Sequence, residues 1–423
     1  MPNRQSASHA VQSASAMGRI TTARDLRRRQ KRIVLGTLAT CALAFLAGEL
    51  ALRALTTITS LGVVAVGRVV LVPWRPTPGT VRAWQERRAS DSYMVPDPEL
   101  GWSLKPSSRT LSPEPPVYTT NAQGFRADPD RVYAEKVPEG KLRLVCVGDS
   151  FTHGDEVGLA DTWEARLEGL DARLEVVNLG VPAFGTDQAL LRWRRDGRSL
   201  QAHAVVLGIW PENMCRNLNL IRFWFSPQSG FWAKPRFVPG AGGELRLVNS
   251  PVPQGVDLVT AVSDPANWPG IAHEKWYEPT LSYKYITDNS RVFRTLRGVL
   301  YARERQLARR RIYSGEDPEG IAITVGIARL FAAEVQATGA VPLVAIMPMR
   351  DLLDEWSGED EFPLAVALEK AGLNVVDLFP AARAAGPGAF LPSGHLTPVG
   401  NAALAAELQK VLPRHVPALA PAR

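Results

Sequence analysis

A serine and a histidine far apart in the chain are of the residue types that make up a nucleophile and its base. Ser150 follows the apolar run 142–147 and the pair Gly148-Asp149, so its hydroxyl is expected on the turn after a buried strand. His395 lies in a loop directly before an expected helix. A serine attacks a carbonyl when a base accepts its proton and fixed donors stabilise the oxyanion. The two residue types indicate acyl-transfer chemistry.

The elements around these residues alternate between strand and helix patterns. Short apolar runs are separated by amphipathic segments long enough for crossover helices, which requires a parallel sheet. The expected strands are 142–147, 174–177, 204–209, 341–347 and 374–377. We therefore expect an α/β fold with a three-layer, doubly wound parallel sheet. In such a sheet the loops after the strands meet at one edge, where Ser150 and His395 can approach each other.

Two blocks resemble the SGNH/GDSL hydrolase family. Gly148-Asp149-Ser150 is similar to its first block, and residues 391–400 are similar to the closing block that carries its catalytic histidine. The resemblance covers roughly residues 95–412, and segments near 97–102 and 120–126 are similar to those of membrane-anchored bacterial members. It implies a flavodoxin-like sheet, Ser150 as nucleophile and His395 as general base.

The resemblance also implies an oxyanion hole made by the Ser150 and Ala183 amides and the Asn213 side chain. The family usually has glycine where Ala183 stands, with Gly185 two residues later, and a backbone donor tolerates the methyl group if φ is negative. A second register places Glu212 at the third donor position, where a carboxylate would repel the oxyanion. The chemistry favours Asn213, whose other interpretation is a turn residue.

The acid that supports the histidine is left open. The family normally has aspartate two or three residues before the histidine, and here those positions hold Ser393 and Pro392. Loss of this carboxylate costs about 10⁴ in turnover in a protease triad. Asp377, at a strand end, is one candidate, and a backbone carbonyl is another. Otherwise the enzyme is slow, or the protein has lost catalysis.

The amino-terminal region predicts a membrane anchor. Residues 1–32 hold eight basic residues and one acidic residue, and residues 33–52 are apolar apart from Glu49. About 20 such residues span a bilayer, and the basic flank predicts a cytoplasmic amino terminus. A signal peptide and a buried soluble helix are the alternatives. We expect one span in the inner membrane, with the catalytic domain outside the cytoplasm.

A second apolar stretch, 54–72, would return the chain to the cytoplasm if it also spanned the membrane. Arg68 interrupts it, and a central cation is costly in lipid, so we predict an amphipathic membrane-proximal helix. Residues 73–120 are rich in proline and predict a tether rather than a domain. The SGNH/GDSL-like domain is then expected over residues 121–413.

An aromatic-rich insertion at about 217–316 interrupts the alternation of strands and helices. It either covers the site or only packs its own aromatic side chains against the domain. Within it, Arg303 to Arg311 predicts a solvated basic helix face.

Composition excludes several classes of function. The formal charge of +7 is carried by residues 1–32, and the remainder has 41 basic and 41 acidic residues. This balance does not support a nucleic-acid groove. The three cysteines form no disulfide or zinc pattern, and no nucleotide loop is present, so we expect no metal and no cofactor.

These observations predict a serine esterase, or an O-acyltransferase, acting on an ester-bearing small molecule or polysaccharide. Acetyl groups of an envelope polysaccharide are a candidate by analogy with the family. The alternative is a binding or scaffolding protein of an envelope assembly that keeps the fold without turnover.

Overall fold

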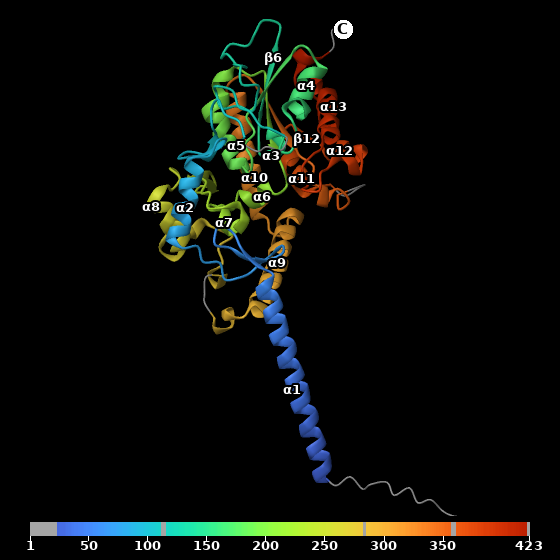
Figure 1. Ribbon diagram of the computed structural model, residues 1–423. Coiled ribbons are helices and arrows are strands. Elements are labelled where there is room, and N and C mark those ends of the chain that lie inside the picture. Colours follow the sequence, from blue (N-terminus) through green and yellow to red (C-terminus); the bar gives the residue numbers. More distant parts are fainter. Residues whose placement is uncertain (1–22, 111–115, 282–284, 357–360, 421–423) are drawn as a thin grey trace, which may run out of the picture.

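Five parallel strands form the central sheet of the computed structural model, which describes residues 23–110, 116–281, 285–356 and 361–420 (Figure 1). The strands lie in the order β12-β11-β8-β6-β7. Their bounds are β6 Leu142–Val147, β7 Leu174–Asn178, β8 Ala204–Ile209, β11 Val341–Ile346 and β12 Val375–Asp377. Numbered by chain order, this is the flavodoxin-like order 2-1-3-4-5, and the predicted α/β fold class is confirmed.

Helices cover both faces of this sheet. Val145 and Val147 of β6 belong to one apolar core, and Leu144 and Cys146 belong to the other, because side chains alternate along a strand. The first core, called the main core below, includes α5 Thr186–Arg192, α10 Glu319–Gln336 and α11 Pro363–Lys370. The second includes α4 Trp163–Leu170, α12 Phe379–Ala385 and α13 Pro398–His415. The three-layer arrangement follows.

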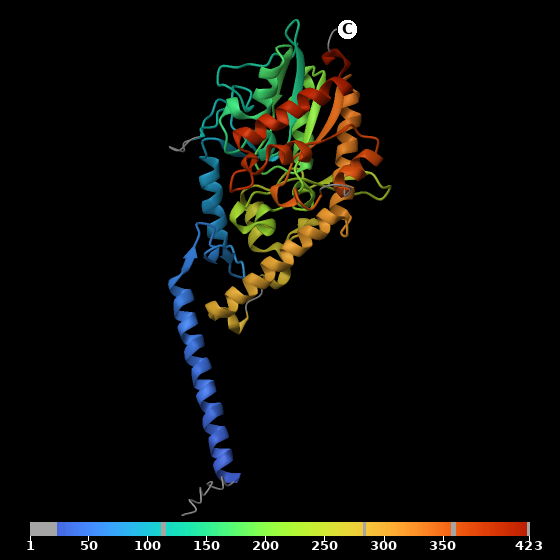
Figure 2. The ribbon, with the colours of Figure 1, turned by 90° about the vertical axis from the view of Figure 1, so that its right-hand side faces the viewer.

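A long amino-terminal helix, α1 Ala23–Ala54, extends away from the globular part (Figures 1 and 2). Among the described residues it is the one helix that is long and apolar enough to cross a membrane. Its position near the amino terminus fits a membrane anchor or a signal sequence. Residues 1–22 of the predicted basic tail lie outside the described residues.

The helix predicted over residues 54–72 is wrong. This segment forms an antiparallel sheet of β1 Thr56–Ile58, β2 Val64–Val66 and β3 Val69–Val70. Its many β-branched residues favour strands. Gly62 and Gly67, with φ of 71° and 55°, supply the turns between them.

The tether predicted over residues 73–120 is also wrong for most of its length. It contains α2 Pro78–Ala89, β4 Met94–Asp97 and β5 Gly101–Leu104, and its Trp84 and Trp102 are buried in the main core. Pro78 does not block α2 because it lies in the first turn, where no amide partner is needed. Residues 111–115 lie outside the described residues.

The insertion packs most of its aromatic side chains into the main core, whereas Tyr285 and Phe293 stay exposed. Phe223, Trp224 and Phe231 are each at most 1% exposed. α6 Asn213–Arg216 directly precedes this region, whose own elements are α7 Arg222–Phe225, β9 Arg236–Pro239, β10 Leu245–Val248, α8 Gly255–Ser263 and α9 Arg291–Ser314.

The basic face predicted over Arg303–Arg311 is only partly solvated. The Arg305 guanidinium lies 4.4 Å from the Trp276 ring centroid, and that of Arg309 lies 4.4 Å from the Phe225 ring centroid. Both side chains therefore pack α9 against the rest of the insertion.

Glu49, the single carboxylate of the apolar segment 33–52, joins α1 to α9. Glu49 accepts hydrogen bonds from Ser290 Oγ at 2.8 Å, Arg291 N–H at 2.9 Å and Val292 N–H at 3.2 Å. A helix begins with amides that have no partner within the helix, and a carboxylate satisfies them. Glu49 thus satisfies the first two amides of α9 from another helix, while the N-cap residue Ser290 accepts the Phe293 N–H at 3.4 Å.

Replacing Glu49 with alanine is expected to lower the free energy of unfolding by about 1–2 kcal/mol, the usual cost of a lost cap. Urea unfolding of the detergent-solubilised protein, followed by tryptophan fluorescence, measures this. Glu86→Ala, at an exposed position on α2, is the matched control and is expected to change stability little. Equal effects of the two variants would contradict the capping role.

Candidate active site

Ser150 lies on a tight turn between β6 and the short helix α3 Ser150–His153. Asp149 begins this helix, and its Oδ1 accepts the Phe151 N–H at 2.9 Å. A Cβ on Gly148 would lie 2.1 Å from Thr152 Oγ1, so the turn requires glycine. The order of the strands reverses between β6 and β8, and Ser150 is held at that point, where doubly wound sheets bind ligands.

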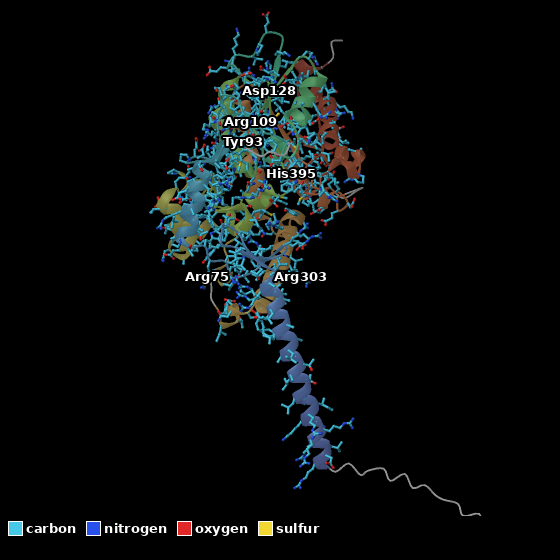
Figure 3. The ribbon with its side chains drawn as sticks, viewed as in Figure 1. Arg75, Tyr93, Arg109, Asp128, Arg303 and His395 are labelled. Atoms are coloured by element: carbon cyan, nitrogen blue, oxygen red, sulfur yellow. The ribbon has the colours of Figure 1, made fainter. Side chains whose placement is uncertain are left out.

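His395 lies beside this serine, although the two are 245 positions apart. Its Nε2 is 3.0 Å from Ser150 Oγ. The Phe151 ring packs against the imidazole, with centroids 5.4 Å apart. Ser150 is 5% exposed, whereas the His395 side chain is 26% exposed, so the imidazole is the more solvent-accessible member of the pair. Figure 3 shows His395 in the middle of the globular part, well away from α1.

A carboxylate from an unpredicted place faces the other nitrogen of His395. Glu156 Oε1 lies 3.5 Å from His395 Nδ1, and Glu156 Oε2 accepts the Ser393 hydroxyl. The Glu156 N–H donates to Tyr118 Oη at 2.6 Å, and the residue has a φ of 66°. The loop that holds Glu156 follows Ser150 closely in the chain, and it brings the carboxylate to the imidazole. Ser393 stands at the position where the family has its acid, and its hydroxyl donates a hydrogen bond to the Glu156 carboxylate.

Asp377 does not face His395 and is a wrong candidate for the acid. Its Oδ1 accepts the Phe379 N–H at 2.9 Å at the start of α12, and burial raises its pKa. No sequence motif identifies Glu156, because it lies six residues after Ser150 in a loop without any recognisable spacing. Only its proximity to the imidazole identifies it.

Two backbone amides are available near Ser150. Among the described residues, the Ser150 and Ala183 N–H groups have no hydrogen-bond acceptor. The φ of Ala183 is 65°, so the condition of a negative φ, under which the methyl group is readily tolerated, is not met. This conformation costs a non-glycine residue about 1–2 kcal/mol and is typical of functional loops.

Asn213 lies at the site, but its amide is fully used. Its Nδ2 donates to Asp149 Oδ2 at 3.0 Å and to the Phe184 carbonyl at 3.1 Å, while its Oδ1 accepts the Trp210 N–H. A donor role toward an oxyanion requires one of these two acceptors to be released. The Gly185 N–H is likewise occupied, by Gln188 Oε1 at 3.0 Å.

Arg216, which the sequence did not single out, neutralises the carboxylates nearest the serine. Its guanidinium lies 3.1 Å from Asp149 and 2.8 Å from Glu212. Burial raises the pKa of Asp149, although Arg216 opposes this effect. Burial acts in the same direction on Glu212, but Arg216 and Arg309 outweigh it and lower its pKa. Glu212 therefore belongs to an arginine cluster and is not an oxyanion donor.

A buried ion pair supports the loop that carries Ala183. Asp187, in the first turn of α5, accepts a hydrogen bond from Lys234, and both side chains are 0% exposed. Lys234 also donates to the carbonyls of Asn219 and Pro235, at 3.2 Å and 2.9 Å. The pair ties the insertion to the start of α5, directly after the loop that carries Ala183.

His153, three residues after Ser150, does not contact the nucleophile. It is fully buried between Tyr93 Oη, 2.6 Å from its Nε2, and Asp155 Oδ1, 2.5 Å from its Nδ1. Burial lowers its pKa against the effect of Asp155. This histidine packs the loop beneath the site. Among the described residues no cluster of histidine, cysteine and carboxylate groups could hold a metal ion.

Comparisons with known proteins give similarity in structure alone. No protein-family model and no curated protein matches the chain. A putative lipolytic protein of the G-D-S-L family from Desulfitobacterium hafniense is 11% identical, covering 64% of this chain and 99% of its own, with a TM-score of 0.34. A lipase/acylhydrolase from Enterococcus faecalis is 13% identical, covering 64% and 96%, with a TM-score of 0.31. The structural neighbours of this chain include lipolytic hydrolases of the GDSL type, at low sequence identity over 64% of its length.

Proposed function

We propose that the protein is a membrane-anchored SGNH/GDSL-type serine esterase or O-acyltransferase. The observation that carries this proposal is the 3.0 Å contact between Ser150 Oγ and His395 Nε2 at the reversal point of the sheet. The free amides of Ser150 and Ala183 and the carboxylate of Glu156 support it, because they supply the donors and the acid that acyl transfer needs.

In this proposal Ser150 attacks the carbonyl carbon of an ester while His395 Nε2 takes its proton. The Ser150 and Ala183 amides bind the oxyanion, and Glu156 stabilises the imidazolium through Nδ1. When the tetrahedral intermediate collapses, His395 protonates the departing alcohol and an acyl-serine remains. Water or a sugar hydroxyl then gives its proton to His395 and attacks the acyl carbon, and as the acyl–Oγ bond breaks His395 returns that proton to Ser150 Oγ. Acetyl groups of an envelope polysaccharide fit this chemistry.

We infer further that α1 is an anchor retained in the mature protein rather than a cleaved signal. Removing it would leave the first amides of α9 without the Glu49 carboxylate. Its basic amino-terminal flank favours a cytoplasmic start, which places the catalytic domain outside the inner membrane.

Labelling with a fluorophosphonate probe tests the catalytic proposal. The solubilised wild-type protein is expected to be labelled, whereas Ser150→Ala and His395→Ala are expected to lose labelling while keeping the wild-type melting temperature. His153→Gln is the control for a nearby histidine and is expected to keep labelling if it folds. A folded wild type that takes no label would favour the binding or scaffolding alternative, which the fully occupied amide of Asn213 also favours.

A further inference from the structure

One face of α9 exposes apolar side chains next to the anchor. Phe293, Leu296 and Leu300, here called the α9 stripe, are 42%, 54% and 51% exposed. Their spacing places them on one side of the helix. The opposite side faces the domain, because a Cβ on Gly298 would lie 2.4 Å from the Val70 carbonyl. The α9 stripe therefore points away from the globular domain.

The α9 stripe begins beside the apolar segment of α1. The rings of Phe45 and Phe293 lie 5.7 Å apart, and Phe45 is about 6 Å further along α1 than Glu49, toward the amino terminus. Ile286, in the turn before α9, is 90% exposed. Figure 2 shows α9 running from beside the upper end of α1 obliquely up to the sheet. The first turns of α9 thus lie at the level where α1 would leave the bilayer.

We propose that the α9 stripe, together with Ile286, is embedded in the surface of the bilayer that holds α1. A helix of this kind buries its apolar face at the boundary of headgroups and acyl chains. The α9 stripe spans about 10 Å along its axis, which suits the interfacial layer. A second attachment point, besides α1, fixes the tilt of the domain and keeps the edge with Ser150 at a constant height above the membrane.

This inference rests on the proposed anchor but not on catalysis. The full-length protein offers a clean labelling background, because Cys146 and Cys215 are buried and Cys41 can be replaced by serine. Leu296→Cys and Leu300→Cys are made one at a time in this background and labelled with an environment-sensitive fluorophore. Each labelled protein is then inserted into vesicles of phosphatidylcholine and phosphatidylglycerol. Doxyl-labelled lipid is expected to quench both at least twofold, while aqueous iodide has little effect.

Two further positions make the result decisive. Leu38→Cys, on the exposed face of α1, reports the anchor, and Leu170→Cys, 48% exposed at the end of α4, reports a solvated leucine. Quenching by doxyl lipid at Leu38 but not at Leu296 and Leu300 overturns the inference and leaves the anchor standing. Absence of lipid quenching at Leu38 overturns both the proposed anchor and the inference about the α9 stripe. Formation of a Leu296→Cys disulfide dimer, with no lipid quenching, assigns the α9 stripe to a second copy and also overturns the inference.

Discussion

Replacing Glu156 with glutamine is expected to lower kcat about a hundred- to a thousandfold with little change in KM. The substitution keeps an acceptor for Ser393 but removes the charge that stabilises the imidazolium. In a protease triad the equivalent change costs about 10⁴. A smaller loss is expected here because Glu156 is 41% exposed and lies 3.5 Å from Nδ1, so solvent already weakens the interaction. Hydrolysis of p-nitrophenyl acetate measures the effect.

Asp377→Asn is the matched control, because Asp377 is the acid that the strand pattern suggested and it does not face the imidazole. It is expected to leave kcat within about twofold of the wild type, since distant charges contribute little. Melting temperatures of the two variants exclude a general loss of structure. If Glu156→Gln keeps more than a third of the wild-type kcat, His395 is oriented by some other group.

Replacing Asp187 with asparagine is expected to lower the free energy of unfolding by about 3–5 kcal/mol. The change leaves the Lys234 ammonium buried without a counter-charge, the situation in which broken buried pairs are most costly. The loop that carries Ala183 leads directly into α5, so activity should fall together with stability. Urea unfolding of the solubilised protein gives the change in stability.

Two comparisons separate the buried charge from the loss of a hydrogen bond. The double variant Asp187→Asn with Lys234→Met removes the unpaired charge and is expected to be more stable than the single variant. Asp317→Asn breaks a half-buried pair with Lys275, at 2.8 Å, and is expected to cost less than about 1 kcal/mol. A cost below 1 kcal/mol for Asp187→Asn would mean that the Lys234 ammonium is not isolated from water.

Local pattern predicted the central sheet well and the amino-terminal region poorly. Buried parallel strands are continuous apolar runs, and each sheet strand lies within two residues of its predicted bounds. The segment 54–72 is also apolar, but it forms strands because β-branched residues and two turns override apolar composition. The proline-rich segment 78–104 folds because Trp84 and Trp102 bury large surfaces in the main core.

The sequence by itself determined where Ser150 lies, because a glycine-aspartate-serine turn after a buried strand is specified by neighbouring residues. It also placed His395 in the loop directly before the last helix. Only the tertiary structure decided which acid faces that histidine, how Ala183 is oriented and what occupies Asn213. These depend on contacts between loops that are far apart in the chain, and no local spacing encodes such contacts. The physical reason is that a side chain's role as acid or donor depends on the atoms within about 3–4 Å of it, which folding alone brings together.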